Sequence, residues 1–167
     1  MQLAASLGDG QLTGRRIVRR HCEVVNAMSQ TDCLFCKIVA GEIPCVKIFE
    51  TEQLLAFLDI APATPGHTLI VPKDHYATLL DAPASLGTAL LDAVQVVGRA
   101  TMDATGATGF NVLANTFASA GQVVMHAHIH VIPRAAGDGL TPWSGKPYAS
   151  NEAMQQLAET LRRHIAV

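Results

Sequence analysis

The sequence has few of the features that mark membrane, nucleic-acid-binding or disulfide-bonded proteins. None of its apolar runs approaches the ~20 residues that a membrane-spanning helix requires, so no membrane partner is expected. The formal net charge is only −2, and no long run of one sign lies outside the N-terminus, which makes a nucleic acid an unfavourable partner.

Cysteine is also scarce, and its distribution is uneven. All four cysteines lie in the first third of the chain: Cys22, Cys33, Cys36 and Cys45. A protein held together by disulfides would be smaller and would have its cysteines distributed more evenly. Clustered cysteines in a chain with seven histidines instead predict a metal site and a reducing compartment, the cytoplasm.

Length and hydrophobicity predict one domain preceded by an extension. The 167 residues, 49% of them hydrophobic, suffice for one domain with a substantial core. Residues 1–31 differ from the rest, because glycines interrupt any periodicity and two Arg–Arg pairs form a basic patch. They contain no apolar stretch of the kind found in secretory signals. Met28, near their end, is an alternative start of translation. We expect a flexible N-terminal extension over 1–31 and a domain over 32–167.

Periodicity along the domain predicts an α+β fold with an antiparallel sheet. A short helix is expected over 35–40. A long helix should begin near Asp81, with Pro83 in its first turn, and continue to about Ala104. The other expected elements are a final helix over 151–165 and strands over 46–49, 54–58, 67–71, 110–114 and 123–132.

Three histidines alternate with apolar residues in the segment 125–132. Residues two apart on an extended strand share a face, so His126, His128 and His130 should project together while the residues between them face a core. Imidazoles are rare in apolar interiors unless they have a partner. An affinity tag would not be interleaved with Ala, Ile and Val, so the row of three predicts a functional site.

Histidine can act as a nucleophile without a metal, because neutral imidazole is a free base near pH 7. It can attack phosphorus and form a covalent intermediate, which divides one difficult displacement into two easier ones. A second, protonated histidine can hold the phosphoryl oxygens. The central His128 is the predicted nucleophile and His130 the predicted phosphate ligand, although His130 could also be a passive neighbour.

Cys33 and Cys36 form a CxxC pair, which by itself is compatible with half of a zinc site, a redox pair or chance. A redox pair usually opens a helix in a thioredoxin-like βαβ unit, and no such unit is expected here. Tetrahedral zinc needs two further ligands, for which we select His75, just after a predicted strand, and His126. Four protein ligands would close the site, so this zinc would be structural rather than catalytic.

Several segments resemble the histidine triad (HIT) family of nucleotide hydrolases and transferases. The segment 126–132 matches the family signature His-φ-His-φ-His-φ-φ, where φ is apolar, and the likeness extends over about 32–134. It includes CLFCKIVAGEIP from Cys33, AFLDIAP from Ala56 and TPGHTLIVPKDH from Thr64. The Hint-like bacterial branch, some of whose members carry a CxxC zinc site, looks most similar. The resemblance implies a HIT-like fold, with about five antiparallel strands, one long helix, a short N-terminal helix and a variable C-terminal segment.

The resemblance also implies roles for individual residues around a purine nucleotide. His128 would carry the nucleotide, and His126 would lie behind it and face the zinc. The residues implied to contact the substrate are Phe35 and Ile38 at the base, Asp59 and Ile60 at the ribose, His130, Asn115 and Gln122 at the phosphate, and a fourth active-site histidine, His67. The plainer alternatives are helix core for Phe35 and Ile38, a turn cap for Asp59 and a buried, hydrogen-bonded imidazole for His67.

The activity implied is a nucleotidyl hydrolase that cleaves a nucleoside phosphoramidate or another adenylated compound to a nucleoside monophosphate. A dinucleoside polyphosphate hydrolase, a nucleotide-binding regulatory protein with incidental catalysis and a zinc-storage protein are the alternatives. Two departures matter. Val123 stands where many relatives have Ser or Thr to assist the leaving group, which weakens the case for phosphoramidates. Thr116 and Phe117 stand where the family usually has a glycine.

Relatives form two-fold dimers, so a homodimer is expected. Its interface would join the long helix and the strand over 110–114, an apolar strand with few charges to protect an edge. Val97 is the helix residue chosen to face the partner. The helix face expected to supply the apolar surface consists of Leu86, Leu90, Leu91, Val94 and Val97.

Overall fold

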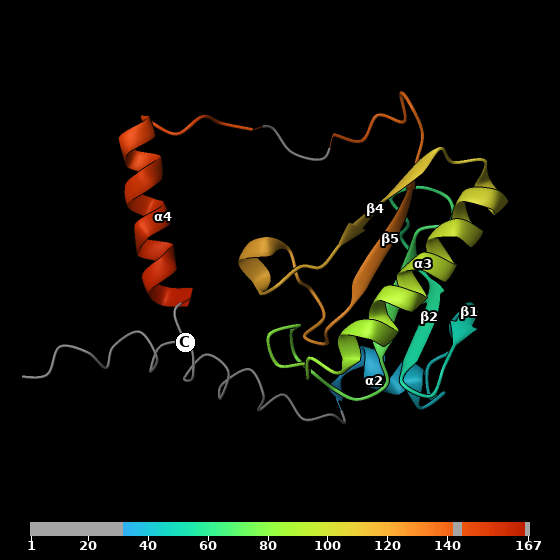
Figure 1. Cartoon of the computed structure of the whole chain (residues 1–167). Coiled ribbons are helices and arrows are strands. Elements are labelled where there is room, and N and C mark those ends of the chain that lie inside the picture. The colour runs from blue at the N-terminus through green and yellow to red at the C-terminus, as the bar shows by residue number, and fades with distance from the viewer. Residues whose placement is uncertain (1–31, 142–144, 166–167) are drawn as a thin grey trace, which may run out of the picture. The chain divides into compact units, whose positions relative to one another are not determined.

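The computed structural model describes residues 32–141 and 145–165 of the chain. They form two compact units with a boundary between Ala136 and Gly137 (Figure 1), and each unit is described separately. The extension expected over 1–31 lies outside the described residues. None of the helices in the described ranges is both long and apolar enough to cross a membrane.

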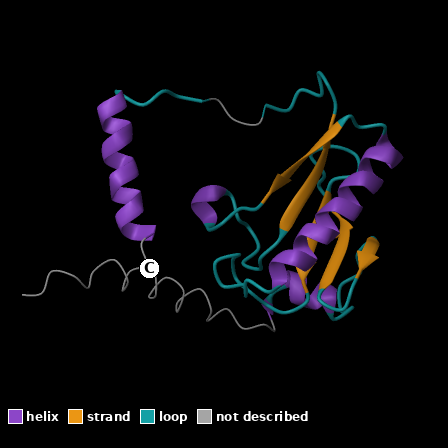
Figure 2. Cartoon of the chain, in the orientation of Figure 1, coloured by secondary structure: helices purple, strands orange, loops and turns teal. Residues whose placement is uncertain are grey.

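The first unit is built on one antiparallel sheet, as predicted (Figure 2). Its five strands lie in the order β1-β2-β3-β5-β4. The strands are β1 (Lys47–Glu50), β2 (Leu54–Leu58), β3 (Thr68–Pro72), β4 (Gly109–Leu113) and β5 (Ile129–Arg134). The unit also contains α2 (Leu34–Val39), α3 (Leu86–Thr105) and a short 3₁₀ turn, η2 (Ala118–Ala120). The α+β prediction is confirmed.

Alternation along the strands gives the sheet two apolar faces. On one face Leu54, Ala56, Ile70, Ile129 and Val131 pack with the buried side of α3. On the other face Leu55, Phe57, Leu69 and Val71 pack with Phe35 of α2. His130 pairs with Leu69 across β3 and β5, and cross-strand partners share a face. The sheet therefore presents His130 toward the α2 side.

Helix α3 begins at Leu86, later than the predicted start near Asp81. The Asp81 carboxylate instead accepts hydrogen bonds from the backbone and hydroxyl of Thr78, at 2.9 and 2.8 Å, and so closes a turn before the helix. Val97 is only 2% exposed and lies in the core under the sheet. The expectation that Val97 faces a partner subunit is therefore wrong.

Strand β5 begins at Ile129, so only 129–132 of the strand predicted over 123–132 is correct. Its pairing with β3 ends at Ile70 and Ile129. Before that point the backbone turns away: the Ala127 N–H donates to the Tyr76 carbonyl at 2.6 Å. His126 and His128 consequently lie in the segment that leads into β5, while His130 lies on the strand.

The second unit contains α4 (Asn151–Ile165), at the predicted bounds. In the described part of this unit the helix buries none of its side chains. Its apolar side chains recur at helical spacing: Met154, Leu157, Leu161 and Ile165.

Candidate functional site

A cavity of about 440 Å³ opens on the α2 side of the sheet, within the range of small-molecule sites. Helix α2 and the end of β2 supply mainly apolar walls. The remaining wall is formed by the loop after β4 and the segment leading into β5. The lining residues that the sequence singled out are Phe35, Ile38, Asp59, Ile60, Asn115, Val123, His128 and His130.

His128 presents a free nitrogen to this cavity. Its Nδ1 lies 2.6 Å from the backbone oxygen of His126. Since a carbonyl oxygen only accepts, Nδ1 must carry the proton. The lone pair of the neutral ring is then on Nε2. The Phe35 ring packs edge-on against the imidazole, with centroids 5.2 Å apart, and fixes its orientation.

His67 and His130 form a directed hydrogen-bond chain. The Ala63 N–H donates to His67 Nδ1 at 3.1 Å, so the proton of neutral His67 is on Nε2. His67 Nε2 lies 2.9 Å from His130 Nδ1 and donates to it. The remaining proton of His130 is therefore on Nε2, which is buried and has no hydrogen-bond partner among the described residues.

Both of these histidines are held neutral. Burial lowers the pKa of His67 below its usual value, and only Asp59 opposes this effect. Burial, with smaller contributions from His128 and His67, lowers the pKa of His130 to about 4. His130, which lines the cavity, is therefore neutral near pH 7, with its unpaired N–H on Nε2, rather than the cation expected from the sequence.

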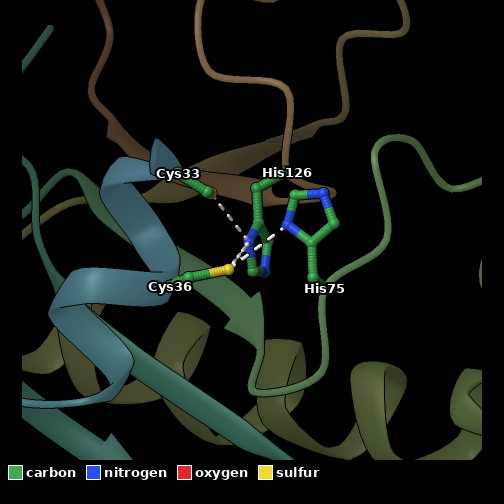
Figure 3. Close-up of side chains that lie close together, drawn as sticks. All are labelled: Cys33, Cys36, His75 and His126. Carbon is green, nitrogen blue, oxygen red and sulfur yellow. Dashed lines mark hydrogen bonds between the residues drawn. The ribbon is translucent and has the colours of Figure 1, made fainter. Parts of the chain in front are cut away.

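The four proposed metal ligands lie together beside this cavity (Figure 3). Cys33 Sγ and Cys36 Sγ lie 3.4 and 3.6 Å from His126 Nδ1, and Cys36 Sγ lies 3.3 Å from His75 Nδ1. A tetrahedral zinc with bonds of ~2.3 Å to sulfur and ~2.0 Å to nitrogen would set such atoms ~3.6 Å apart. The cluster therefore has the dimensions of a four-coordinate metal site.

The surroundings of the cluster also suit a metal. His126 is fully buried and its Nε2–H donates to the Pro72 carbonyl at 2.8 Å, which fixes the tautomer with Nδ1 toward the sulfurs. Burial, with Cys33 adding to the effect, raises the pKa of the Cys36 thiol to about 11. A cation is needed to hold two adjacent thiolates in such a place.

A second group of possible ligands, Asp59, His67 and His130, has a different geometry. The two ring nitrogens that face each other are 2.9 Å apart, whereas two nitrogens on one tetrahedral zinc would be ~3.4 Å apart. This pair is a hydrogen bond, and the Asp59 carboxylate lies 3.6 Å from His67 Nδ1, beyond hydrogen-bonding distance.

Asp59 and Ile60 lie at the rim of the cavity. One Asp59 oxygen accepts the Ala61 N–H at 2.9 Å, which is the turn cap considered for it from the sequence. Its other oxygen lies 3.6 Å from His67 Nδ1. Ile60 is 99% exposed, so its side chain is free to contact a ligand.

Gln122 and Asn115 belong to the loop that contains η2. Gln122 is not among the residues that line the cavity. Its Nε2 donates to the carbonyls of Ala77 and Val124, at 2.7 and 3.1 Å. Its Oε1 accepts the Phe117 N–H at 2.8 Å. Phe117 adopts φ +67° and ψ 164°, a region strongly favouring glycine, and Gln122 helps to hold it there.

Some cavity residues were missed by the sequence analysis. Phe57, Leu69 and Cys45 also line it, and alternation along β2 and β3 could have placed the first two on the α2 face. The Ala63 backbone amide, which sets the tautomers of two histidines, leaves no signal in residue type.

Known proteins are similar to this chain in sequence and in fold. The HIT domain family matches residues 40–137, which contain all three alternating histidines. The chain is 40% identical over 148 residues to adenylylsulfatase HINT3 of Arabidopsis thaliana, covering 86% of this chain and 74% of the relative. It is 41% identical over 135 residues to adenosine 5′-monophosphoramidase hnt1 of Schizosaccharomyces pombe, covering 80% and 98%.

A solved structure is also similar. It is a zinc-bound histidine triad family protein from Mycobacterium smegmatis, which is 35% identical with a TM-score of 0.64 over 79% of this chain and 99% of that one. The family match covers more than half of the chain and contains the five strands of the sheet and the three alternating histidines. The protein therefore belongs to the HIT family.

Proposed function

We propose that this protein hydrolyses nucleotidyl compounds to a nucleoside monophosphate through a nucleotidyl-His128 intermediate. The observation that carries the proposal is the pairing of a free lone pair on His128 with the buried, unpaired N–H of His130 in one cavity. The named activities of the two relatives, an adenylylsulfatase and a monophosphoramidase, support the same class of reaction.

The first step is attack on the α-phosphorus. His128 Nε2 forms the new bond as the leaving group departs, and the resulting imidazolium keeps its Nδ1–H on the His126 carbonyl. His130 Nε2–H lies ready to donate to a phosphoryl oxygen, where negative charge accumulates in the transition state. In the second step water attacks phosphorus, the bond from phosphorus to Nε2 breaks and its electron pair returns to His128, and one proton of the water passes to solvent as the nucleoside monophosphate leaves.

The rest of the cavity suits a purine nucleoside. Phe35 and Ile38 supply apolar surface on α2 for the base, Asp59 has an oxygen within reach of the ribose hydroxyls, and Ile60 packs beside it. Asn115 lines the cavity and is assigned to the phosphate. Gln122 is assigned to the same end, where its bonds to Phe117, Ala77 and Val124 position the loop.

Zinc is the metal proposed for the cluster of Cys33, Cys36, His75 and His126. Two thiolates and two imidazoles are its preferred donors, and the distances fit its tetrahedral geometry. When bound, it would supply folding free energy and would have no open position for chemistry. His126 would link this site to His128 through its backbone carbonyl. Thiolate ligands are best preserved in a reducing compartment, which supports a cytoplasmic location.

We also propose a homodimer. Edge strand β4 exposes Val112 and Leu113, and α3 exposes Leu91 and Val96, with exposed fractions between 38% and 58%. An apolar edge strand of this kind favours pairing with a second chain. Of the helix face expected from the sequence only Leu91 is kept, because Leu86 and Val97 are buried in the core and Leu90 and Val94 pack against it.

Kinetics on a panel of adenylated compounds would test the proposed function. The panel consists of an adenosine phosphoramidate, adenylyl sulfate and a diadenosine polyphosphate, each assayed with wild type and His128→Ala. Release of AMP by the wild type and a loss of kcat of several orders of magnitude in the variant are expected. Turnover of only the diadenosine compound would favour the polyphosphate hydrolase, and equal rates for the two proteins would contradict the His128 mechanism.

A further inference from the structure

The wall of the cavity that contains His128 and His130 includes an exposed apolar side chain. Val123 lines the same cavity as His128 and His130 and is 90% exposed. Among the described lining residues there is no Ser, Thr, Tyr, Lys or Arg. The lining groups that carry or accept a proton are Cys45, Asp59, His128 and His130.

None of these groups is suited to give a proton to a leaving group near His128. The His128 proton is on Nδ1, bonded to the His126 carbonyl, and Nε2 forms the bond to phosphorus. Asp59 accepts the Ala61 N–H and faces His67. Cys45 packs with the apolar cluster around Phe35, on the α2 side of the cavity.

His130 can donate a hydrogen bond but cannot readily part with its proton. If Nε2 lost its proton, Nδ1 would have to take the one from His67 Nε2. His67 could regain a proton only through Nδ1. That nitrogen faces the Ala63 backbone N–H, whose proton is not transferable, and the Asp59 carboxylate, which is an acceptor. The hydrogen-bond chain from Ala63 through His67 to His130 therefore stabilises negative charge on the phosphate without acting as a general acid.

The need for a proton depends on the leaving group. In a phosphoramidate the P–N bond breaks, its electron pair goes to nitrogen, and the amine must gain a proton to leave. In a mixed anhydride the bridging P–O bond breaks, and its electron pair leaves on a sulfate or carboxylate that is stable as an anion. The second reaction needs no proton from the enzyme.

We infer that this protein prefers adenylyl mixed anhydrides, whose leaving group departs as an oxyanion, over phosphoramidates, and that Val123 determines this preference. The inference rests on the proposed function and names its substrate class. Sequence identity does not decide the question, because the adenylylsulfatase and the monophosphoramidase are 40% and 41% identical to this chain.

The test compares leaving groups in three proteins: wild type, Val123→His and Val123→Ala. His places a protonatable group at the exposed position, and Ala removes the bulk of Val without adding a donor. The substrates are an adenosine phosphoramidate, adenylyl sulfate and an acyl adenylate. Each kcat/KM is divided by the uncatalysed rate constant, because anhydrides are intrinsically more reactive.

For the wild type, the corrected values for both anhydrides should exceed that for the phosphoramidate by about 100-fold or more, since a general acid contributes roughly 10²–10⁴-fold. In Val123→His the ratio of phosphoramidate to anhydride should rise at least about tenfold at pH 6, while in Val123→Ala it should stay near the wild-type ratio. A preference for only one of the two anhydrides would still support the oxyanion class and would identify the leaving group.

Two results would overturn the inference. One is a wild-type corrected kcat/KM for the phosphoramidate equal to or above both anhydrides. The other is the same change of ratio in Val123→His and Val123→Ala, which would mean that side-chain bulk and not proton supply is decisive. Failure of the wild type to hydrolyse any of the three compounds would contradict the proposed function as well.

Discussion

Removing one ligand of the metal cluster should destabilise the whole first unit. His75→Ala deletes the imidazole that lies 3.3 Å from Cys36 Sγ, and leaves three of the four donors. Because His75 lies in the loop after β3 and Cys36 on α2, the metal would tie two segments that are distant in sequence. Its loss should therefore lower the stability of the fold, beyond any local effect.

The magnitude follows from linkage between metal binding and folding. A ligand that binds only the folded state stabilises it by about 2.7 kcal/mol at a free concentration of 100 Kd and about 4.1 kcal/mol at 1,000 Kd. For a chain of 167 residues, each kcal/mol corresponds to about 2–4 °C in Tm. His75→Ala should thus lower Tm by about 5–16 °C.

Thermal unfolding with and without a chelator, together with elemental analysis, checks this prediction. Wild type should contain close to one zinc per chain and lose stability with the chelator, whereas His75→Ala should contain little zinc and respond weakly. Cys45→Ser is the matched control, because this thiol lies outside the cluster. A wild type without zinc, or one whose Tm is insensitive to the chelator, would refute the reasoning.

Three further predictions concern pH, packing and assembly. Folding lowers the pKa of His130 from 6.5 to about 4, so the unfolded chain binds more protons between these values. The free energy of unfolding, measured by urea denaturation, should therefore fall as pH decreases from 6.5 to 4, and fall less in His130→Asn. Gly98→Ala would place a Cβ 2.5 Å from the Phe110 ring and should lower the free energy of unfolding by about 1–3 kcal/mol. Gly87→Ala, on the same helix with nothing within 4 Å of its Cβ, should be neutral or stabilising by up to about 1 kcal/mol. Light scattering should give twice the chain mass of 17.7 kDa and a lower mass for Leu91→Glu; a monomeric wild type would exclude the dimer.

Periodic patterns located most of the fold. Strand β2 and helix α4 occur at the predicted bounds, because Gln53 and Asp59 flank the apolar run of β2 and the apolar residues of α4 recur at helical spacing. The starts of α3 and β5 were misplaced. In both cases a tertiary or turn contact decided the boundary: Asp81 bonds to Thr78, and the Ala127 N–H bonds to Tyr76. The first is a local turn that competes with the start of the helix, and the second is a tertiary contact that periodicity does not reveal.

The site could be predicted as a set of residues but not as a set of hydrogen bonds. Spacing and family resemblance brought together the four metal ligands and most of the cavity. The sequence predicted a protonated His130, whereas the structure holds it neutral. Its burial and the direction of the hydrogen bonds from Ala63 through His67 depend on the three-dimensional structure. The engagement of Gln122 with the backbone of Phe117 likewise depends on a loop conformation.

The central claim is that His128 Nε2 carries the nucleotide. Rapid quenching of wild type mixed with an adenylated substrate, followed by mass spectrometry of the peptide spanning 125–134, tests it most directly. We predict one adenylyl group on His128 at times shorter than one turnover and none in His128→Ala. An adenylyl group on another residue, or no covalent species while His128→Ala retains wild-type turnover, would contradict the account.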